Sequence, residues 1–214
     1  GNIIDLAELL YNSSDVSYLI HQIERNAPSC VSVSLPTAKP NKPQNSFENL
    51  QVLSISHPAL IKYLGERCID IEIARTICKE LHFDTRGKHY FGIGFPNIAG
   101  GYEIRNSFFK GCIAPKDISH FYAEEPKKVC FLFEGFMDFL SFMTLRRKEN
   151  DGLKRQDYLV LNSVSNVHKA LESLSHYENV QCFLDNDEAG RNAYKQLSEE
   201  LGSSVLDSSS LYSD

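Results

Sequence analysis

Three short runs of apolar residues dominate the second half of the chain and constrain its fold most. They are VCFLF at 129–133, YLVL at 158–161 and VQCFL at 180–184. Each run has the length of a strand, lacks the alternation of a half-exposed strand, and is followed by a helical pattern. Such strands, separated by helices, are typical of a parallel sheet covered on both faces. The sequence therefore predicts an α/β domain over residues 126–214, with SSVL at 203–206 as a fourth strand.

The first half of the chain is organised differently. Residues 1–26 carry two short helical patterns, and the stretch rich in Pro, Ser and Asn that follows predicts a linker over 27–49. Residues 50–125 combine two helices, in HPALIKYLGERCIDIEIARTICKEL, with a strand, a Gly-rich turn and a second strand, in KHYFGIGFPNIAGGYEIRNSFF. We expect this part to form a smaller α+β subdomain with a β-hairpin ahead of the α/β domain.

Polar residues stand where each apolar run ends. Glu134 follows the first run, the polar pair at 162–163 follows the second, and Asp185 leads the acids after the third. Asp187 comes two residues later, and Asp138 lies one helical turn beyond Glu134. Ligands of open parallel sheets bind beyond the carboxyl ends of the strands. We therefore expect these side chains to meet on one rim of the sheet.

The gathering of acids on this rim predicts a metal ion. Two carboxylates about 4 Å apart repel by about 4 kcal/mol at an effective dielectric constant of about 20, so a positive charge should share the space. Oxygen ligands without Cys or His favour a hard cation, Mg²⁺ or Mn²⁺. The six cysteines form no C-x-x-C and no Cys/His spacing typical of zinc, so we expect reduced thiols and no zinc site within this chain.

Other interpretations of the same acids were weighed. Asp185 and Glu188 would also suit the N-terminus of the following helix, where acids cap the backbone and complement the helix dipole. The segment DNDEAG imitates the start of an EF-hand loop, but Ala189 and Gln196 stand where that loop needs ligands. A phosphatase or response-regulator sheet would need an Asp nucleophile where this chain has Glu134.

A basic patch precedes the α/β domain. The net charge of −6 argues against a general nucleic-acid coat. Between residues 86 and 116, however, five cations stand against one acid, Glu103. These cations are Arg86, Lys88, Arg105, Lys110 and Lys116. A local patch of this kind predicts contact with a polyanion.

Two separated motifs resemble those of a known family. EGFMD at 134–138 and DNDEAGR at 185–191 are similar to the two signature motifs of the Toprim domain, which primases, topoisomerases and some nucleases share. The variants present here are most similar to bacterial replicative primase. Together with HPALIKYLGERCIDIEIARTICKEL, GGYEIRNSFFKG and LVLNSVSN, they resemble primase-related Toprim proteins of Bacteroides-type mobile elements. One departure from that pattern is Cys68, where the family leads us to expect Gly.

The resemblance implies DNA-templated synthesis of short RNA primers, a nucleotidyl transfer. Asp185 and Asp187 would hold Mg²⁺ or Mn²⁺, Glu134 would be a further ligand or a base for the 3′-hydroxyl, and Asp138 would be a supporting charge. The hairpin in GFPNIAGGYEIRNSFFKG is similar to the one that approaches nucleic acid or nucleotide in the primase core. The nucleic-acid-binding positions would then be Arg105, Asn106, Lys110 and Lys116.

Partners and alternatives follow from the same resemblance. We expect a single-stranded DNA template, nucleotides and a replicative helicase as partners, a cytoplasmic location and no membrane. The N-terminus resembles the segment after a zinc ribbon, so any zinc would belong to a preceding ribbon, and this fragment is expected to be weakly active or inactive. The alternatives are a Toprim nuclease and a non-catalytic nucleic-acid-binding module of a mobilisation or replication apparatus.

Overall fold

The structure is a computed structural model that describes residue 7 and residues 10–26, 47–147 and 155–209. The chain divides into two compact units, residues 1–44 and residues 45–214. Most of the linker expected over 27–49, and most of the first helical pattern, lie outside the described residues. Within the described part of the chain, no helix has both the length and the apolar character needed to cross a membrane.

The first unit contains helix α2, Val16–Asn26. Asp15 begins it, because its Oδ1 accepts hydrogen bonds from the backbone N–H groups of Ser17 (3.0 Å) and Tyr18 (3.2 Å). Its Leu19 is fully buried. The second helical pattern is therefore confirmed.

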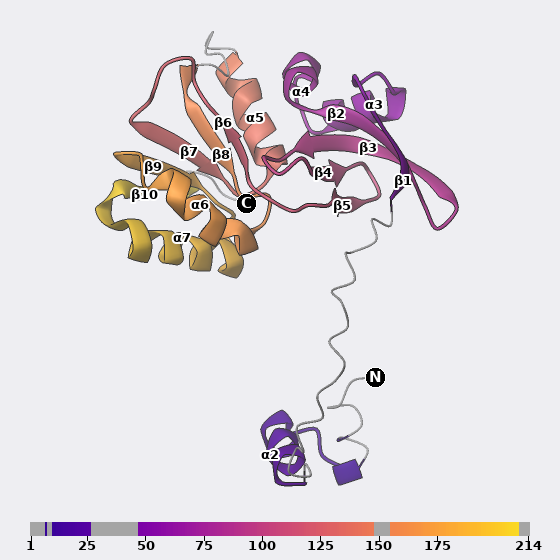
Figure 1. The fold of residues 1–214 in the computed structure, drawn as a ribbon, viewed down its shortest axis with the longest axis vertical. Coiled ribbons are helices and arrows are strands. Elements are labelled where there is room, and N and C mark those ends of the chain that lie inside the picture. Colours follow the sequence, from indigo (N-terminus) through magenta and orange to yellow (C-terminus); the bar gives the residue numbers. More distant parts are fainter. Residues whose placement is uncertain (1–6, 8–9, 27–46, 148–154, 210–214) are drawn as a thin grey trace. The chain divides into compact units, whose positions relative to one another are not determined.

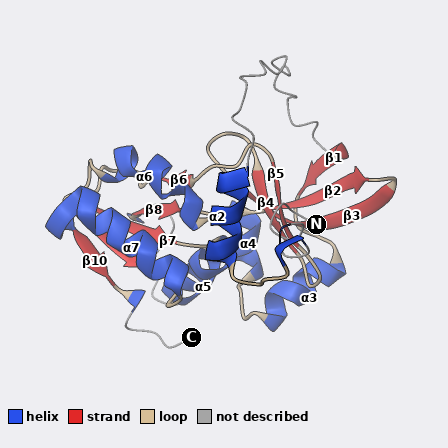
Figure 2. Ribbon diagram, turned by 90° about the horizontal axis from the view of Figure 1, so that it is seen from below, coloured by secondary structure: helices blue, strands red, loops and turns tan. Residues whose placement is uncertain are grey.

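The second unit begins with an antiparallel sheet of five strands in the order β1-β2-β3-β4-β5 (Figures 1 and 2). The strands are β1 (Glu48–Leu53), β2 (Lys79–Thr85), β3 (Lys88–Pro96), β4 (Tyr102–Arg105) and β5 (Lys110–Ile113). The predicted hairpin corresponds to β3 and β4, which pair antiparallel with Gly94 opposite Ile104. The other three strands were not predicted.

Helices α3 (Pro58–Glu66) and α4 (Ile71–Ile77) confirm the two predicted helices of this subdomain. The second is shorter than expected, because residues 79–81 were assigned to it and belong to β2. Leu81 and Phe83 alternate with more exposed neighbours and are buried in the sheet, which explains the change of structure. Cys68 has φ +55°, a conformation that Gly adopts most easily, so the expected glycine matches the backbone at this turn.

The α/β domain contains a second sheet of five strands in the order β10-β9-β7-β8-β6. Its strands are β6 (Ser119–Phe121), β7 (Val129–Phe133), β8 (Asp157–Val160), β9 (Asn179–Phe183) and β10 (Val205–Asp207). The four predicted strands pair parallel to one another. The sheet is nevertheless mixed, since β6 adds an antiparallel edge strand beside β8.

Three helices cover this sheet on both faces. They are α5 (Phe136–Arg147), α6 (Val167–Leu174) and α7 (Glu188–Leu201). Phe133 of β7 packs in a core with residues of α5, while its neighbour Leu132 packs in a second core with residues of α6 and α7. Both faces of β7 are thus buried, which explains why its sequence is apolar without alternation.

One aromatic core joins the two sheets. The ring of Phe95, on β3, stacks on Phe136 of α5 with centroids 5.0 Å apart. Phe121 of β6 stacks on Phe139 of the same helix at 5.2 Å. Phe95, Phe136 and Phe139 belong to a single cluster of buried residues. The hairpin subdomain is therefore packed directly against the helix that follows the first motif.

Asp70 holds α4 to α5. Its Oδ1 accepts hydrogen bonds from the backbone N–H groups of Glu72 (2.8 Å) and Ile73 (3.2 Å), and Arg147 of α5 pairs with the same oxygen. Burial alone would raise the pKa of Asp70, but the two backbone hydrogen bonds and the charge of Arg147 hold it below its ordinary value.

We expect Asp70→Ala to lower the free energy of unfolding by about 1 kcal/mol at pH 7, as loss of an N-cap does. Because the pKa is lower in the folded state, this contribution is present above the unfolded-state pKa and is lost as the pH falls through the folded-state pKa. Urea unfolding of the unmodified protein and of Asp70→Ala, at pH 7 and below about pH 3, measures the contribution of Asp70 to the free energy of unfolding. An equal difference at both values would contradict the assignment.

Candidate functional site

The three strand ends that carry the predicted polar residues are neighbours. Strand β7 lies between β9 and β8 in the sheet. The backbone N–H of Glu134, just after β7, donates to the carbonyl of Phe183 in β9 (3.3 Å), and Leu161, just after β8, donates to the carbonyl of Phe133 (2.9 Å). Glu134 thus lies between the other two strand ends. The predicted convergence at one rim is confirmed.

A cavity of about 490 Å³ opens at this rim. Its acidic side is formed by Glu134, Asp138 and Asp185, and its other side by the hairpin subdomain. The hairpin contributes Arg105 and Lys110, from β4 and β5, whose Cα atoms are directly paired in the antiparallel register. The remaining lining residues are Glu103, Gly111, Cys112, Lys116, Gly135, Asn162, Ser163, Val164 and Asn166. Six of the eight sequence-predicted site residues therefore line one cavity.

Two acids of this cavity, Glu134 and Asp138, have raised pKa values. Burial raises the pKa of Glu134, and the carboxylates of Asp185, Asp187 and Asp138 raise it further. Burial also raises the pKa of Asp138, and so does Asp185, while the charges of Arg105 and Arg67 oppose the shift. The Oε2 of Glu134 accepts a hydrogen bond from the backbone N–H of Asp185 (3.2 Å), which ties the two motifs together.

Asp187 has a structural role that was not predicted for it. It is the N-cap of α7, and its Oδ1 accepts a hydrogen bond from the backbone N–H of Gly190 (2.8 Å). The capping alternative named Asp185 and Glu188. The cap is instead Asp187, while Asp185 lines the cavity, and Glu188 lies in the first turn, where an acid complements the helix dipole. Asp187 does not line the cavity but is close enough to Glu134 to influence its pKa.

Gly190 fixes the path of the loop between β9 and α7. A Cβ atom at this position would lie 2.0 Å from the carbonyl oxygen of Asp185 and 2.9 Å from its carbonyl carbon. These are backbone atoms and cannot move aside as a side chain can. The glycine of the second motif is therefore required for the close approach of α7 to Asp185.

The basic hairpin has an ordered turn. The side chain of Asn106 donates to the carbonyl of Phe91 (2.7 Å) and accepts from the backbone N–H of Phe108 (2.8 Å). Asn106 does not line the cavity, and it shapes the turn between β4 and β5. Phe108, which the sequence analysis did not single out, has 97% of its surface exposed at this turn.

The loop after β8 connects the rim to the segment before β6. Asn162 has φ +63°, and its Nδ2 donates to the carbonyl of Asp117 (2.8 Å) and to Ser119 Oγ (3.0 Å). Its Oδ1 is buried and has no hydrogen-bond partner among the residues that the structure describes. The sequence analysis expected a polar loop here, and the structure explains how its conformation is held.

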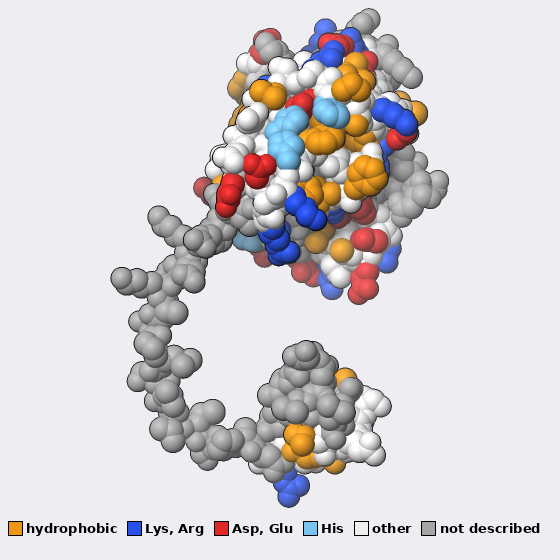
Figure 3. Space-filling model, turned by 90° about the vertical axis from the view of Figure 1, so that its right-hand side faces the viewer, with side chains coloured by type: hydrophobic (Ala, Val, Ile, Leu, Met, Phe, Trp, Pro, Cys, Tyr) orange, Lys and Arg blue, Asp and Glu red, His pale blue; other side chains and the backbone are white. Residues whose placement is uncertain are grey.

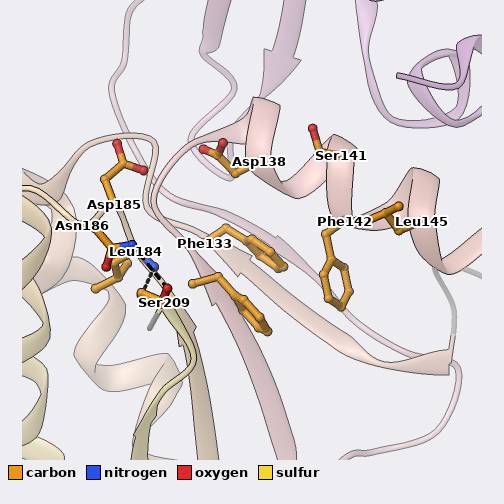
Figure 4. A pocket seen from close by; sticks show the side chains of 10 residues that line it. Phe133, Asp138, Ser141, Phe142, Leu145, Leu184, Asp185, Asn186 and Ser209 are labelled. Carbon is orange, nitrogen blue, oxygen red and sulfur yellow. Dashed lines mark hydrogen bonds between the residues drawn. The ribbon is translucent and has the colours of Figure 1, made fainter. Parts of the chain in front are cut away.

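A second, smaller pocket of about 260 Å³ adjoins the acids on the side away from the hairpin (Figure 4). It is lined by the aromatic rings of Phe133, Phe142 and Phe183, and Asp138 and Asp185 belong to its lining as well as to that of the larger cavity. These two carboxylates therefore form the wall between an apolar pocket and a charged cavity. Of the two, the charged cavity is the one that combines acids with Lys and Arg side chains.

The donor set fits a hard cation. Among the residues that the structure describes, no group of three or more His, Cys, Asp or Glu side chains is placed to enclose a metal ion. Mg²⁺ does not require such an enclosure, since it usually keeps several waters and binds through one or two carboxylates together with substrate phosphates. The rim offers carboxylate oxygens without sulfur or imidazole ligands.

Arg67 and Glu103 also belong to the charged surroundings of the cavity and were not predicted as site residues. Arg67 follows α3 and contributes a positive charge at Asp138. Burial raises the pKa of Glu103, against the charges of Lys116, Lys110 and Arg105. No motif marks either residue, because each reaches the site through tertiary packing.

Residues 131–213 match a family model described as Toprim-like, and residues 49–114 match a domain of unknown function, DUF8464. The fold is similar to the primase fragment of the bacteriophage T7 primase–helicase protein, with 17% identity, a TM-score of 0.48, and coverage of 75% of this chain and 66% of that one. No curated protein matches the chain significantly.

The fold is also similar to the zinc-binding and RNA polymerase domains of Aquifex aeolicus primase, with 15% identity, a TM-score of 0.47, and coverage of 97% of this chain and 64% of that one. The chain thus spans less than two thirds of the length of each of these two proteins. The Toprim-like match covers Glu134, Asp138 and Asp185 with the strand ends that bring them together. Residues 131–213 of this chain therefore form a Toprim-like domain.

Proposed function

We propose that the protein is a primase-type nucleotidyltransferase that synthesises short RNA primers on single-stranded DNA. The observation that carries this proposal is the cavity between the rim and the hairpin, where the three carboxylates of the rim face three cations, with a fourth acid, Glu103, beside the cations. Transfer of a nucleotidyl group requires both, since the metal ligands and the phosphate-binding groups must meet at the reacting phosphate. The Toprim-like match supports the same reaction class.

The acids of the rim would hold Mg²⁺ or Mn²⁺. The ligands that we propose are Asp185, Asp187 and Glu134. A bound ion would neutralise charge on the attacked phosphate and orient it. Glu134 would alternatively act as the base for a 3′-hydroxyl, a role that is supported by the rise in its pKa from burial and from its acidic neighbours. Asp138 supports the negative charge of the rim.

The cations of the hairpin side would bind phosphates of the template and of incoming nucleotides. Arg105 and Lys110 project from paired positions on β4 and β5 into the cavity, and Lys116 joins them from the segment that follows. Because binding releases counterions from the nucleic acid, it should weaken steeply with salt. Asn106 would contribute by shaping the turn.

Lys110→Ala is expected to weaken binding to single-stranded DNA and to reduce the slope of log K against log salt concentration by about 0.7, the loss of one phosphate contact. Fluorescence anisotropy at several salt concentrations measures the slope. Lys62→Ala is the matched control, because Lys62 lies on α3, is 77% exposed and does not line the cavity. Equal slopes for both variants would contradict the proposed contact.

Phe108→Ala is expected to weaken the same binding by about 1 kcal/mol or more without changing the salt slope. Phe108 is 97% exposed on the turn between Arg105 and Lys110, and stacking on a base does not release counterions. The anisotropy assay with oligonucleotides separates the two effects. A changed slope, or unchanged affinity, would contradict a stacking role for Phe108.

The test of function uses single-stranded templates, labelled ribonucleotides, and Mg²⁺ or Mn²⁺. Short RNA products that depend on Asp185 support the proposal. Degradation of the template would instead indicate a nuclease, and salt-sensitive binding without any product would indicate a binding module. A replicative helicase is the partner that we propose, and its addition should raise the yield of primers if the two proteins act together.

A further inference from the structure

Two histidines that do not line the charged cavity face each other on the sheet of the hairpin subdomain. His82 lies on β2 and His89 on β3, and His82 Nδ1 is 3.1 Å from His89 Nε2. Their rings are stacked, with centroids 5.3 Å apart. Figure 3 shows histidine side chains grouped beside apolar ones on one face of the molecule.

A carboxylate backs each of these histidines. His82 Nε2 lies 2.8 Å from Glu80 Oε1, and His89 Nδ1 lies 2.9 Å from Asp84 Oδ1. Asp84 and His89 are directly opposite each other in the register of β2 and β3. The four side chains therefore form one chain of contacts, from Glu80 through both imidazoles to Asp84.

Both carboxylates are held as hydrogen-bond acceptors. Glu80 is buried, and its Oε2 accepts from the backbone N–H groups of Ser56 and His57, each at 2.8 Å. Asp84 Oδ2 accepts from the side-chain amide of Asn49 (2.7 Å). An ionised carboxylate can only accept, so the outer nitrogen of each imidazole must carry a proton.

This arrangement determines what lies between the histidines. A neutral imidazole has one N–H and one lone pair. If the outer nitrogens, His82 Nε2 and His89 Nδ1, carry the protons, the inner nitrogens present two lone pairs to each other across 3.1 Å. Two lone pairs at this distance repel, and a positively charged group between them is needed to turn the contact into an attraction.

We propose that His82 and His89 form a binding site for a divalent late transition metal, of the Zn²⁺, Ni²⁺ or Cu²⁺ class. Two nitrogens bound at about 2.0 Å to one tetrahedral ion are about 3.3 Å apart, close to the separation observed here. A carboxylate on the outer nitrogen of a ligating histidine fixes its tautomer and raises its basicity, and both histidines have this support.

Water completes the coordination. Within the described residues no cluster of three or more ligating side chains accompanies the pair. The side chain of His89 is 59% exposed, which leaves room for bound water on its outer side. The nearby His57 has other contacts: its Nδ1 accepts from the backbone N–H of Ala59, and its ring packs against that of Phe91 with centroids 4.1 Å apart. The ion would therefore join β2 to β3 from the surface.

The site is independent of the proposed nucleotidyl transfer. None of its four residues lines the charged cavity, and its nitrogen ligands select metals other than the Mg²⁺ proposed there.

The test is calorimetric titration of the whole chain with ZnCl₂, NiCl₂ or CuCl₂ at pH 7.5, with MgCl₂ as a separate arm. We expect one transition-metal ion to bind per chain, and Mg²⁺ not to bind at this position. His89→Gln should remove that binding, and His168→Gln, which changes an exposed histidine on α6, should not. Asp84→Asn should weaken it by about 10- to 100-fold.

His89→Gln changes an exposed side chain, so the fold should survive, and circular dichroism verifies this. His82→Gln provides the second variant, with the same expected loss. The proposal is overturned if no transition metal binds the unmodified chain, or if binding persists unchanged in both folded variants. In those cases the bridging group is a shared proton. Primer synthesis in His89→Gln should remain unchanged, which separates this proposal from that of the cavity.

Discussion

Asp185→Asn is expected to abolish primer synthesis while the protein stays folded. The carboxylate of Asp185 lines the charged cavity and lies at the end of β9, next to Glu134. Asparagine keeps the shape and the backbone N–H that donates to Glu134, but it removes the charge that would hold the metal. Loss of about 4 kcal/mol of transition-state stabilisation by the metal would lower the rate roughly a thousandfold.

The thermal stability of Asp185→Asn should be unchanged or higher, although its activity is lost. Asp185 raises the pKa values of Glu134 and Asp138, which means that the three carboxylates repel one another in the folded protein. Removing one charge relieves that repulsion. Thermal unfolding should therefore show an equal or higher midpoint, together with the lost activity.

Glu199→Gln is the matched control for Asp185→Asn. It removes one negative charge from α7 at a side chain that is 66% exposed and lies outside the cavity. Its activity should equal that of the unmodified protein. If Asp185→Asn still produced primers at a comparable rate, Asp185 would have no role in metal binding, and the assignment of the rim as the active site would be wrong.

Gly190→Ala is expected to lower the free energy of unfolding by about 3 kcal/mol, at the upper end of the usual effect of overpacking. The added Cβ would lie 2.0 Å from the carbonyl oxygen of Asp185. Relief requires α7 or the loop to shift, and either movement displaces Asp185 and the cap at Asp187. Primer synthesis should fall with stability.

Gly65→Ala tests whether glycine replacement itself causes the loss. Gly65 is on α3, and no atom lies within 4 Å of the position that its Cβ would take. Alanine favours the helix more than glycine does, so this variant should be slightly more stable, by up to about 1 kcal/mol. Urea unfolding compares the two. A similar loss in both would refute the steric argument for Gly190.

The α/β domain could be predicted well because its strands are buried on both faces. Val129–Phe133 is apolar without alternation, which is typical of a strand in a covered parallel sheet. The antiparallel sheet was harder to predict. Lys79–Thr85 continues a helical pattern, and Glu48–Leu53 is exposed along its whole length, so neither has a clear strand signal.

The candidate site was predictable where it depends on strand ends. Glu134 and Asp185 meet because β7 and β9 pair in parallel, so that both strands end at the same edge of the sheet. The cap formed by Asp187 and the turn formed by Asn106 depend on local backbone geometry that residue type alone does not determine. His82 and His89 are seven residues apart, a spacing that matches no metal motif until the hairpin between β2 and β3 brings them together.

The short strand β6 has a consequence for how this protein can be divided. It falls between the two segments that match family models, residues 49–114 and 131–213, and belongs to neither. Yet Ser119 donates to the carbonyl of Pro96 on β3 and accepts from Asn162 beyond β8. If the chain were divided between the matched segments, the sheet of the α/β domain would lose its edge strand β6, or the antiparallel sheet would lose the hydrogen bond from Ser119 to β3. Recombination that exchanged only one of the matched segments would break the same contacts. We therefore expect residues 49–114 and 131–213 to occur together in related proteins.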